Sequence, residues 1–353
     1  AGEFNNANTH ARRSIMLIVR PVKADDIYGL VSLAEAAYPG MTTLPPDPEV
    51  LAKKIEKSTA SLATPVTQPG RENYLLVMED TDANCLAGTA AIIAQLGEED
   101  QFYSYKINKV THCNKALDKK VTVETLNLSN HFEGFSEVAT LFLDDAYRKN
   151  GNGKLLARSR YLFMAEFRAR FPDQVMADLR GYFDARGRSP FWEALGRHFF
   201  DMGFSEADLF GAINGNQFIA DLMPTQPVYV NLLPREAQEV IGRPHDDGKP
   251  ALAMLEKEGF HWRGQIDIFD GAPSVDAFID QLTTVKESAR GQITESTDSH
   301  SGDDYIVCGG DAANFAACIS KLKILGNGAV ALPEQTLQAL SLNIHDPIRF
   351  VAL

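Results

Sequence analysis

The sequence has little of what marks a redox, secreted or membrane-spanning protein. Its four cysteines, at positions 85, 113, 308 and 318 of 353 residues, show neither metal-ligand spacing nor a disulfide-rich pattern. We therefore expect reduced thiols and a cytoplasmic location. No apolar run approaches the length needed to cross a membrane, and residues 1–15 lack the apolar core of a signal peptide. We interpret residues 1–15 as a tag or leader and expect the natural chain to begin at Met16.

Basic residues are too few for a nucleic-acid surface. The chain carries 34 Lys and Arg against 47 Asp and Glu, which gives a formal net charge of −13. Because nucleic acids and anionic membranes both attract basic surfaces, we expect neither as a partner. An acidic protein suits a cationic small-molecule substrate, although most acidic proteins are simply soluble, so the charge carries little weight.

Several catalytic motifs are also missing. The sequence contains no G-x-G-x-x-G dinucleotide loop, no G-x-x-x-x-G-K-[ST] phosphate loop and no G-x-S-x-G nucleophile elbow. We therefore expect neither a covalent nucleophile nor a metal site, and no permanently bound cofactor.

The most informative stretch is Ser136–Arg170. It begins with an apolar run rich in β-forming residues, continues through Arg148–Gly153, spaced R-x-x-G-x-G, and ends in an amphipathic helix. The two glycines let the backbone approach a ligand closely, and free N–H groups at a helix start attract phosphate. This order of strand, loop and helix resembles the pyrophosphate-binding signature of the GCN5-related N-acetyltransferases, which bind acyl-coenzyme A.

Longer segments resemble the arginine N-succinyltransferase family, from Met16 to about Pro273. The resemblance implies an α+β fold of the GCN5-related acyl-CoA N-acyltransferase type, with a mixed, mostly antiparallel sheet flanked by helices. Because AMLEKEGFHWRG echoes FWEALGRHFFDMGF, we leave open that the fold is duplicated, and we expect a small C-terminal β module. The segments that carry the resemblance are MLIVRPV, GMTTLPP, TLFLDDAYRKNGNG, ADLRGYFDARGRSPFWEALGRHFF, IADLMPTQPVY, EAQEVIGRPH and MLEKEGF.

Changes in composition divide the chain. The sequence becomes rich in loop residues after Met223-Pro224 and strongly polar between Glu287 and Asp303. The expected units are the leader (1–15), the acyl-CoA N-acyltransferase domain (16–225), a second, degenerate half that carries His245 (226–290), a linker (291–303) and the small β module (304–353).

The family resemblance implies a reaction. It is the transfer of succinyl from succinyl-CoA, a co-substrate, to the α-amine of L-arginine in arginine catabolism. Preference for arginine or ornithine stays open. The alternatives are a non-catalytic or regulatory subunit, or an N-acyltransferase for another amine or acyl-CoA. We expect a homo-oligomer, or a hetero-oligomer with a homologous subunit.

The resemblance and the chemistry together give candidate catalytic and coenzyme residues. The family match places the proton-donating histidine at His245 and an acyl-CoA contact at Leu141, whose backbone N–H can polarise the thioester. Glu137 is a second acid–base candidate, because many acetyltransferases place a carboxylate on this strand. The other expected coenzyme contacts are Leu143, Arg148, Lys149, Asn150, Gly151, Asn152 and Gly153.

Substrate contacts follow from the charges of the two reactants. Because a guanidinium fork binds carboxylates well, we expect Arg180, Arg186 or Arg188 to hold the succinyl carboxylate. Thr42 and Thr43, in a proline-rich loop, would close over the amino acid. The candidates for binding the guanidinium of the substrate are Asp178, Asp184, Asp267 and Asp270.

Overall fold

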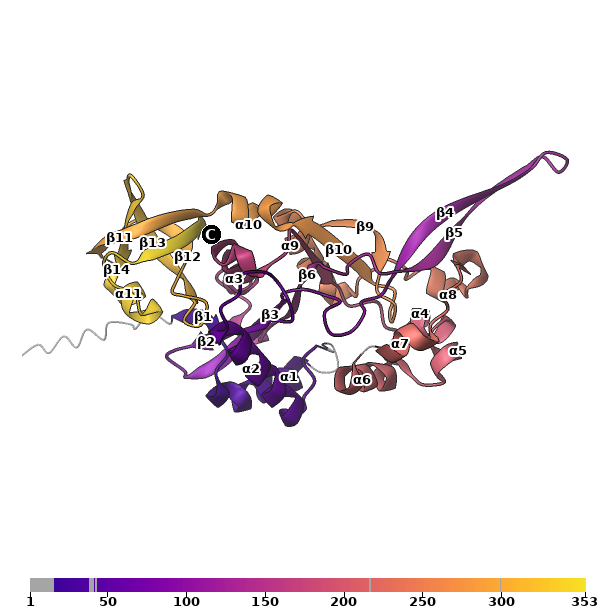
Figure 1. The fold of residues 1–353 in the computed structure, drawn as a ribbon, viewed down its shortest axis with the longest axis horizontal. Helices are drawn as coiled ribbons and strands as arrows, with labels where there is room; N and C mark the ends of the chain where they lie inside the picture. Colours follow the sequence, from indigo (N-terminus) through magenta and orange to yellow (C-terminus); the bar gives the residue numbers. More distant parts are fainter. Residues whose placement is uncertain (1–15, 38–40, 42, 216, 299) are drawn as a thin grey trace, which may run out of the picture.

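A computed structural model of the chain describes residues 16–37, 41, 43–215, 217–298 and 300–353 (Figure 1). Its strands join in one hydrogen-bonded network, ordered β12-β15-β11-β14-β13-β1-β2-β3-β6-β7-β10-β9-β4-β5-β8. Most neighbours are antiparallel, whereas β6–β7 and β11–β14 are parallel. The predicted α+β class with a mixed, mostly antiparallel sheet is therefore confirmed. In the described ranges, no helix combines the length and the apolarity that crossing a bilayer requires.

The first strands of the sheet carry helices on both faces (Figure 1). Along β2, Tyr74 and Leu76 pack into the core under α3, whereas Leu75 and Val77 pack into a separate core under α1 and α2. This alternation follows from the two-residue period of a strand. The elements are β1 (Leu17–Pro21), α1 (Ile27–Ala37), α2 (Pro48–Ala63), β2 (Asn73–Asp80), β3 (Cys85–Ile93), β6 (Ser136–Leu143), α3 (Asn152–Glu166) and β7 (Gln174–Asp178).

The parallel strands β6 and β7 pair over a very short length. Ser136 pairs with Val175 and Glu137 with Met176, and the ladder ends there although both strands continue. The two strands thus separate near the middle of the sheet. This separation is the feature of the fold that positions the functional site.

Residues 226–290 contribute strands β8, β9 and β10 to the same sheet, which corrects the expected unit boundary at residue 225. Strand β10 pairs with β7, and β9 pairs with β10, both antiparallel. The described residues of this segment thus complete one sheet, and a boundary at residue 225 would cut it. The elements are α9 (Lys249–Glu258), β9 (His261–Ile266), β10 (Pro273–Phe278) and α10 (Thr283–Glu287).

Between β7 and α9 the chain forms a cluster of short helices. Residues 190–200 form two short helices, with Gly196 at the break between them. The Trp192 ring occupies the space beside this glycine, where an added Cβ would lie 2.3 Å from the ring. The elements are α4 (Pro190–Ala194), α5 (Arg197–Phe200), α6 (Phe204–Asn214), α7 (Gln217–Leu222), β8 (Val228–Tyr229) and α8 (Arg235–Gln238).

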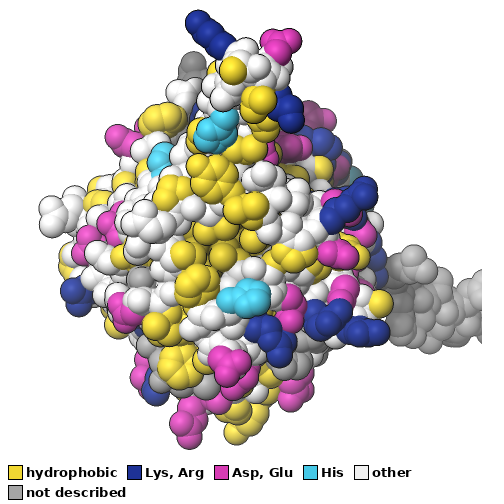
Figure 2. Space-filling view, turned by 90° about the vertical axis from the view of Figure 1, so that its right-hand side faces the viewer, with side chains coloured by type: hydrophobic (Ala, Val, Ile, Leu, Met, Phe, Trp, Pro, Cys, Tyr) yellow, Lys and Arg dark blue, Asp and Glu magenta, His cyan; other side chains and the backbone are white. Residues whose placement is uncertain are grey.

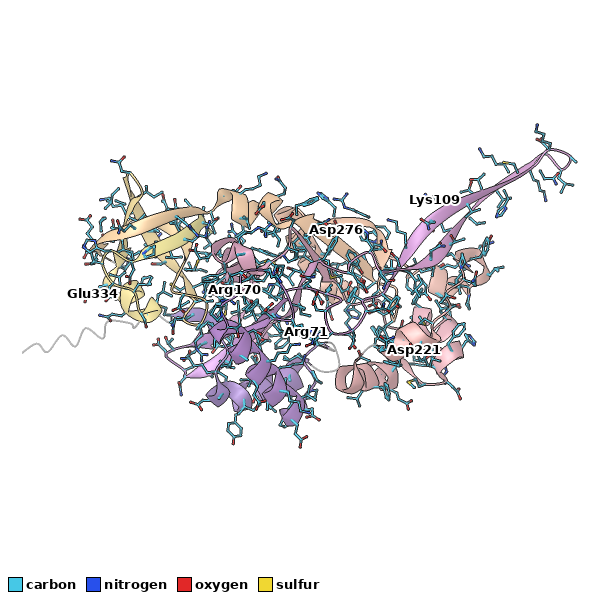
Figure 3. The ribbon with its side chains drawn as sticks, in the orientation of Figure 1. Arg71, Lys109, Arg170, Asp221, Asp276 and Glu334 are labelled. Atoms are coloured by element: carbon cyan, nitrogen blue, oxygen red, sulfur yellow. The ribbon has the colours of Figure 1, made fainter. Side chains whose placement is uncertain are left out.

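Strands β4 (Ser104–Asn114) and β5 (Lys119–Ser129) form a hairpin that projects from one end of the molecule (Figure 1). The hairpin joins the body at its base, where β4 pairs with β9 and β5 with β8. Lys109 lies on the projecting part (Figure 3). The expectation that these segments extend the sheet is confirmed at this base.

The C-terminal unit continues the sheet on the other side, because Val19 of β1 pairs with Ala317 of β13. The linker predicted at residues 291–303 is wrong, since most of it is strand β11, in which Ile293 is fully buried. The predicted β-runs after Tyr305 are confirmed as strands. The elements are β11 (Ala289–Thr297), β12 (Asp303–Gly309), β13 (Ala316–Gly326), β14 (Ala329–Pro333), α11 (Glu334–Leu340) and β15 (Pro347–Ala352).

Candidate active site

A cavity of about 1030 Å³ opens where β6 and β7 separate. Its wall includes Val138 and Leu141 of β6 and Ala177 of β7. On one side, which we call the α3 face, the wall comes from α3, α9 and α10. On the other, which we call the α2 face, it comes from Lys54 of α2 and from the loop that contains Thr43. The separation of the strands thus connects the two faces of the sheet.

A β-bulge shapes the β6 wall of this cavity. Thr140 and Leu141 together stand opposite a single residue of β3, Ala90. Thr140 has a φ of 52°, a left-handed value that β-branched residues rarely adopt. Its hydroxyl and that of Thr43 form a hydrogen bond of 3.1 Å, which helps to hold this backbone. The bulge places Leu141 on the cavity wall, as a main-chain contact to a thioester would require.

The R-x-x-G-x-G loop leads from the cavity wall into α3. Arg148 is on the wall, and its side chain donates to the Leu143 carbonyl at 2.9 Å and pairs with Asp145 at 2.8 Å. Gly151 precedes the helix with a φ of 82°, which glycine adopts at little cost. The first-turn N–H groups of a helix have no partner within the helix and attract anions. Lys154 of that turn is also on the wall.

The other residues expected to contact coenzyme have different positions. The Leu143 side chain is buried in the core under α3 and is not on the cavity wall. Asn152 supports the loop, because its side-chain amide donates to the Tyr147 carbonyl at 2.9 Å. Lys149 and Asn150 lie in the loop and Gly153 in the first turn of α3, all between the wall residues Arg148 and Lys154, and their contacts to coenzyme stay predictions.

Basic side chains gather on the α3 face. Arg148, Lys154, Arg158 and Lys257 are on this wall, together with two acids of α9 and α10. Arg158 donates to the hydroxyl of Thr284 at 2.8 Å and to the carbonyl of Ala352 at 2.7 Å. Ala352 and Leu353 are themselves on the wall, so the C-terminal unit contributes to the site.

Acidic side chains gather on the α2 face. Glu137, Asp178, Asp267 and Asp270 are all on the wall, and burial raises the pKa of each carboxyl, that of Glu137 to about 7. The carboxyl groups also raise one another's pKa by repulsion, as Asp267 does for the other three. Lys54 faces Glu137 and has a pKa lowered by burial. A cationic ligand would relieve this repulsion.

His245 reaches the cavity from the loop between α8 and α9. Its backbone N–H donates to the Arg180 carbonyl at 2.7 Å, and Gly181 bridges Pro244, which ties the loop to the end of β7. The Nδ1 atom of His245 accepts the N–H of Asp247 at 3.2 Å. In the neutral imidazole the proton is therefore on Nε2, which can donate it.

The structure separates the three arginines expected to bind succinate. Arg180 is on the cavity wall, with its guanidinium 4.7 Å from the centre of the Phe183 ring. Arg188 forms an exposed ion pair of 2.8 Å with Asp184, and neither Arg188 nor the exposed Arg186 is on the wall. The sequence could not separate them because all three follow the same strand within nine residues.

Two further expectations concern the acceptor substrate. Thr43 is on the wall, whereas Thr42 lies outside the described residues. Of the acids proposed for the guanidinium, Asp178, Asp267 and Asp270 are on the wall. The sequence suggested each acid as a separate candidate, whereas the structure places three of them together on one wall.

Five basic residues of the cavity wall were not predicted from the sequence: Lys54, Lys154, Arg158, Arg160 and Lys257. Arg160 is only 2% exposed. A signal for it exists: Arg160 is four residues after Leu156 and three before Phe163, so helical spacing places it on the apolar face of α3. Lys54 lacks such a signal, because it stands among other charged residues of α2.

Comparisons with known proteins agree along the whole chain. A family model described as the arginine N-succinyltransferase beta subunit matches residues 17–284, and a model of its C-terminal domain matches residues 289–352. Arginine N-succinyltransferases of Escherichia coli and Yersinia pestis are each 38% identical, over 96% of this chain and 98% of theirs. The solved arginine/ornithine succinyltransferase subunit AI of Pseudomonas aeruginosa is 32% identical, with a TM-score of 0.87, over 96% of this chain and 99% of that one.

Proposed function

The chain belongs to the arginine N-succinyltransferase family, and from this premise we propose that it transfers the succinyl group of succinyl-CoA to the α-amine of L-arginine. The fold is proposed to be of the GCN5-related N-acyltransferase type. Support for this comes from the separation of the parallel strands β6 and β7, and from β10, which is inserted between β7 and β9. The role would lie in arginine catabolism, with succinyl-CoA as co-substrate.

The polarity of the cavity carries this proposal. Its α3 face is rich in Lys and Arg, beside a loop whose helix start suits a pyrophosphate. Its α2 face holds the carboxyls of Glu137, Asp178, Asp267 and Asp270. An anionic acyl-CoA would thus enter from the α3 face, and a cationic amino acid would bind at the α2 face. The two meet where β6 and β7 separate.

The chemistry needs no covalent enzyme intermediate. The amine nitrogen attacks the thioester carbonyl carbon, a C–N bond forms, and the C–S bond breaks. Glu137 would take the amine proton, since a pKa near 7 suits a base at neutral pH. The N–H of Leu141 would stabilise the oxyanion, and Nε2–H of His245 would supply a proton to the leaving thiolate.

The acceptor would be held by opposite charges. The carboxyls of Asp178, Asp267 and Asp270 suit its guanidinium, which has five N–H donors. Arg180, on the same wall, suits one of the substrate carboxylates, and Thr43 would complete that side of the site. Because ornithine is shorter and lacks the planar fork, the preference between the two amino acids depends on this cluster.

Assembly and location belong to the same proposal. The hairpin of β4 and β5 carries five lysines against two acids in a chain of net charge −13, and its end of the molecule shows a band of exposed hydrophobic side chains (Figure 2). We infer that a second copy of the chain covers this end, although a homologous subunit would offer similar chemistry. The exposed hydrophobic side chains include Phe199, Leu222, Tyr229, Leu232 and Trp262.

The four cysteines are free thiols, as a reducing cytoplasm requires.

A substrate panel tests the proposed reaction. Purified protein would be given L-arginine, L-ornithine or agmatine, which lacks the carboxylate, each with succinyl-CoA or acetyl-CoA, and products would be identified by mass spectrometry. We expect N-succinyl-L-arginine to form fastest. Faster conversion of another amine, or of acetyl-CoA, would overturn the assignment.

A further inference from the structure

Arg160 of α3 is a buried cation without an acidic partner. Its side chain is 2% exposed and is on the wall of the cavity. Its Nε donates to the Ala157 carbonyl at 3.3 Å and its Nη1 to the Ala139 carbonyl at 3.4 Å, which are both long bonds to neutral groups. No ion pair joins Arg160 to any residue that the structure describes. Burial also lowers the pKa of its guanidinium.

Such a position is costly in the free protein. A buried guanidinium stays charged and has five N–H donors, of which at most two are used by Arg160. An ion removed from water is destabilised unless an opposite charge accompanies it. The neighbouring acid Glu258 accepts the backbone N–H of Thr284 at 2.5 Å and forms no ion pair with Arg160 among the described residues. An anionic ligand in the cavity would therefore find a donor group already in place.

The position of Arg160 along α3 decides which anion it meets. Arg160 comes eight residues after Asn152, which starts the helix, so it lies about 12 Å along the axis from the phosphate loop. Its backbone is thus about two helical turns beyond the loop that would bind the pyrophosphate. Its bond to the Ala139 carbonyl instead places it beside the β-bulge of Thr140 and Leu141, where the thioester is proposed to lie.

We propose that Arg160 binds the terminal carboxylate of the succinyl group and thereby selects succinyl-CoA over acyl donors without a charge. This assignment rests on the proposed acyl-CoA-dependent function. A guanidinium and a carboxylate form two parallel hydrogen bonds, which favour one acyl length and orientation. Of the other basic residues on the α3 face, Arg148 pairs with Asp145 and Arg158 donates to the Ala352 carbonyl. Lys154 and Lys257 lack the planar fork that a carboxylate matches with two hydrogen bonds.

The same geometry gives Arg180 a different role. Arg180 belongs to the α2 face, beside the ring of Phe183 and near the carboxyl of Asp270. That face is where the amino acid is proposed to bind. Arg160 would thus hold the carboxylate of the donor and Arg180 that of the acceptor, so the two substitutions affect different substrates.

The test compares donors in Arg160→Met, which keeps an unbranched apolar side chain but removes the guanidinium and its charge. The ratio of kcat/KM for succinyl-CoA to that for acetyl-CoA should fall at least about tenfold, as for the loss of one charge-assisted pair. Inhibition by free CoA, which has no acyl group, should be unchanged. The matched control is Arg158→Met, on the same helix, which should affect both donors alike. A proportional loss with both donors in Arg160→Met, or no change, would overturn the proposal.

Two further measurements keep the test independent of folding and of turnover. Arg160→Lys keeps a charge but not the fork, and should show a smaller fall of the same ratio. Equilibrium binding of succinyl-CoA and of CoA to unmutated protein needs no catalysis. Tighter binding of succinyl-CoA that is lost in Arg160→Met would support Arg160 even if no amine is acylated. Equal binding of both by unmutated protein would contradict the proposal.

Discussion

Glu137 and Met176 form the last residue pair between the parallel strands β6 and β7. Beyond this pair the strands separate and the cavity begins. A carboxyl thus occupies the point where the two faces of the sheet meet, on the cavity wall and near Lys54 and Asp267. Burial at this point raises the pKa of Glu137 to about 7. The geometry of the sheet therefore determines both where the acyl group can react and which residue can take a proton there.

Glu137 leads to a prediction about pH and activity. A base must be ionised, so kcat should rise as pH increases through about 7, the pKa of Glu137. In Glu137→Gln, kcat should fall by about 10²–10⁴-fold, and this limb of the pH profile should disappear. Profiles of kcat between pH 5.5 and 9 would check it. Persistence of the limb in the variant would assign it to another group.

The effect of Glu137→Gln on the stability of the protein provides an independent check of the raised pKa. A carboxyl whose pKa rises from 4.5 to about 7 on folding stabilises the protein fully below pH 4.5, and this stabilisation is lost as pH rises through 7. The loss amounts to about 3 kcal/mol for such a shift. The free energy of unfolding of Glu137→Gln, minus that of the unmutated protein, should therefore increase from pH 5 to pH 8. Denaturant titrations of both proteins at pH 5 and at pH 8 would measure this difference.

The glycines of the phosphate loop allow a matched comparison. An added Cβ on Gly153 meets nothing closer than 4.0 Å, whereas on Gly151 it meets Leu353 at 3.3 Å and requires a strained φ. Gly153→Val should therefore keep the fold while its side chain blocks approach of the pyrophosphate. We expect the KM for succinyl-CoA to rise about tenfold, and Gly151→Val to lose stability as well.

Gly203, at the start of α6, provides a control for the loop variants, because a Cβ there meets nothing within 4 Å. Gly203→Ala should leave the KM for succinyl-CoA unchanged. An unaltered KM in a folded Gly153→Val protein would remove the phosphate-loop assignment.

The three arginines after β7 should differ in their effects. Arg180→Gln removes a charge from the cavity wall and should raise the KM for L-arginine about tenfold or more. Arg186→Gln and Arg188→Gln change exposed residues, and solvent screens the exposed pair of Arg188 with Asp184, so both substitutions should have little effect. Steady-state kinetics would compare the KM for L-arginine in all three variants. Equal losses in the three variants would contradict a separate role for Arg180.

His245 is expected to act in proton transfer. His245→Ala removes Nε2–H from the cavity and should lower kcat by about 10²–10⁴-fold, with the KM for succinyl-CoA nearly unchanged. An acyl donor whose leaving group is more acidic than the thiol of CoA should partly restore the rate of this variant. A variant that keeps more than about a third of the original kcat would exclude the role of His245 as the proton donor.

Local signals in the sequence were enough for many elements. Asp47 was predicted to start a helix, and its carboxylate indeed accepts the N–H groups of Glu49 and Val50. The apolar run before Asp144 was predicted to be a central strand, and β6 lies between β3 and β7. These features depend on neighbours in sequence, which is why composition and spacing could reveal them.

Features that depend on distant residues could not be predicted in this way. The bulge at Thr140 arises from the register of β6 against β3, and no residue type near it indicates a positive φ. The carboxyl cluster joins Glu137 of β6 to Asp267 and Asp270 of the loop between β9 and β10. Strand β11 was taken for a linker because its exposed residues are polar, although Ile293 is buried.

The most direct measurement is thiol release by this chain purified alone, with succinyl-CoA and L-arginine as the reactants. The account predicts one free CoA thiol for each N-succinyl-L-arginine formed, and no release when L-arginine is omitted. The cavity, the loop at Arg148–Gly153 and His245 all belong to the single chain, so no partner should be needed. Folded protein that binds succinyl-CoA but releases no thiol with L-arginine would contradict the account and indicate a non-catalytic subunit.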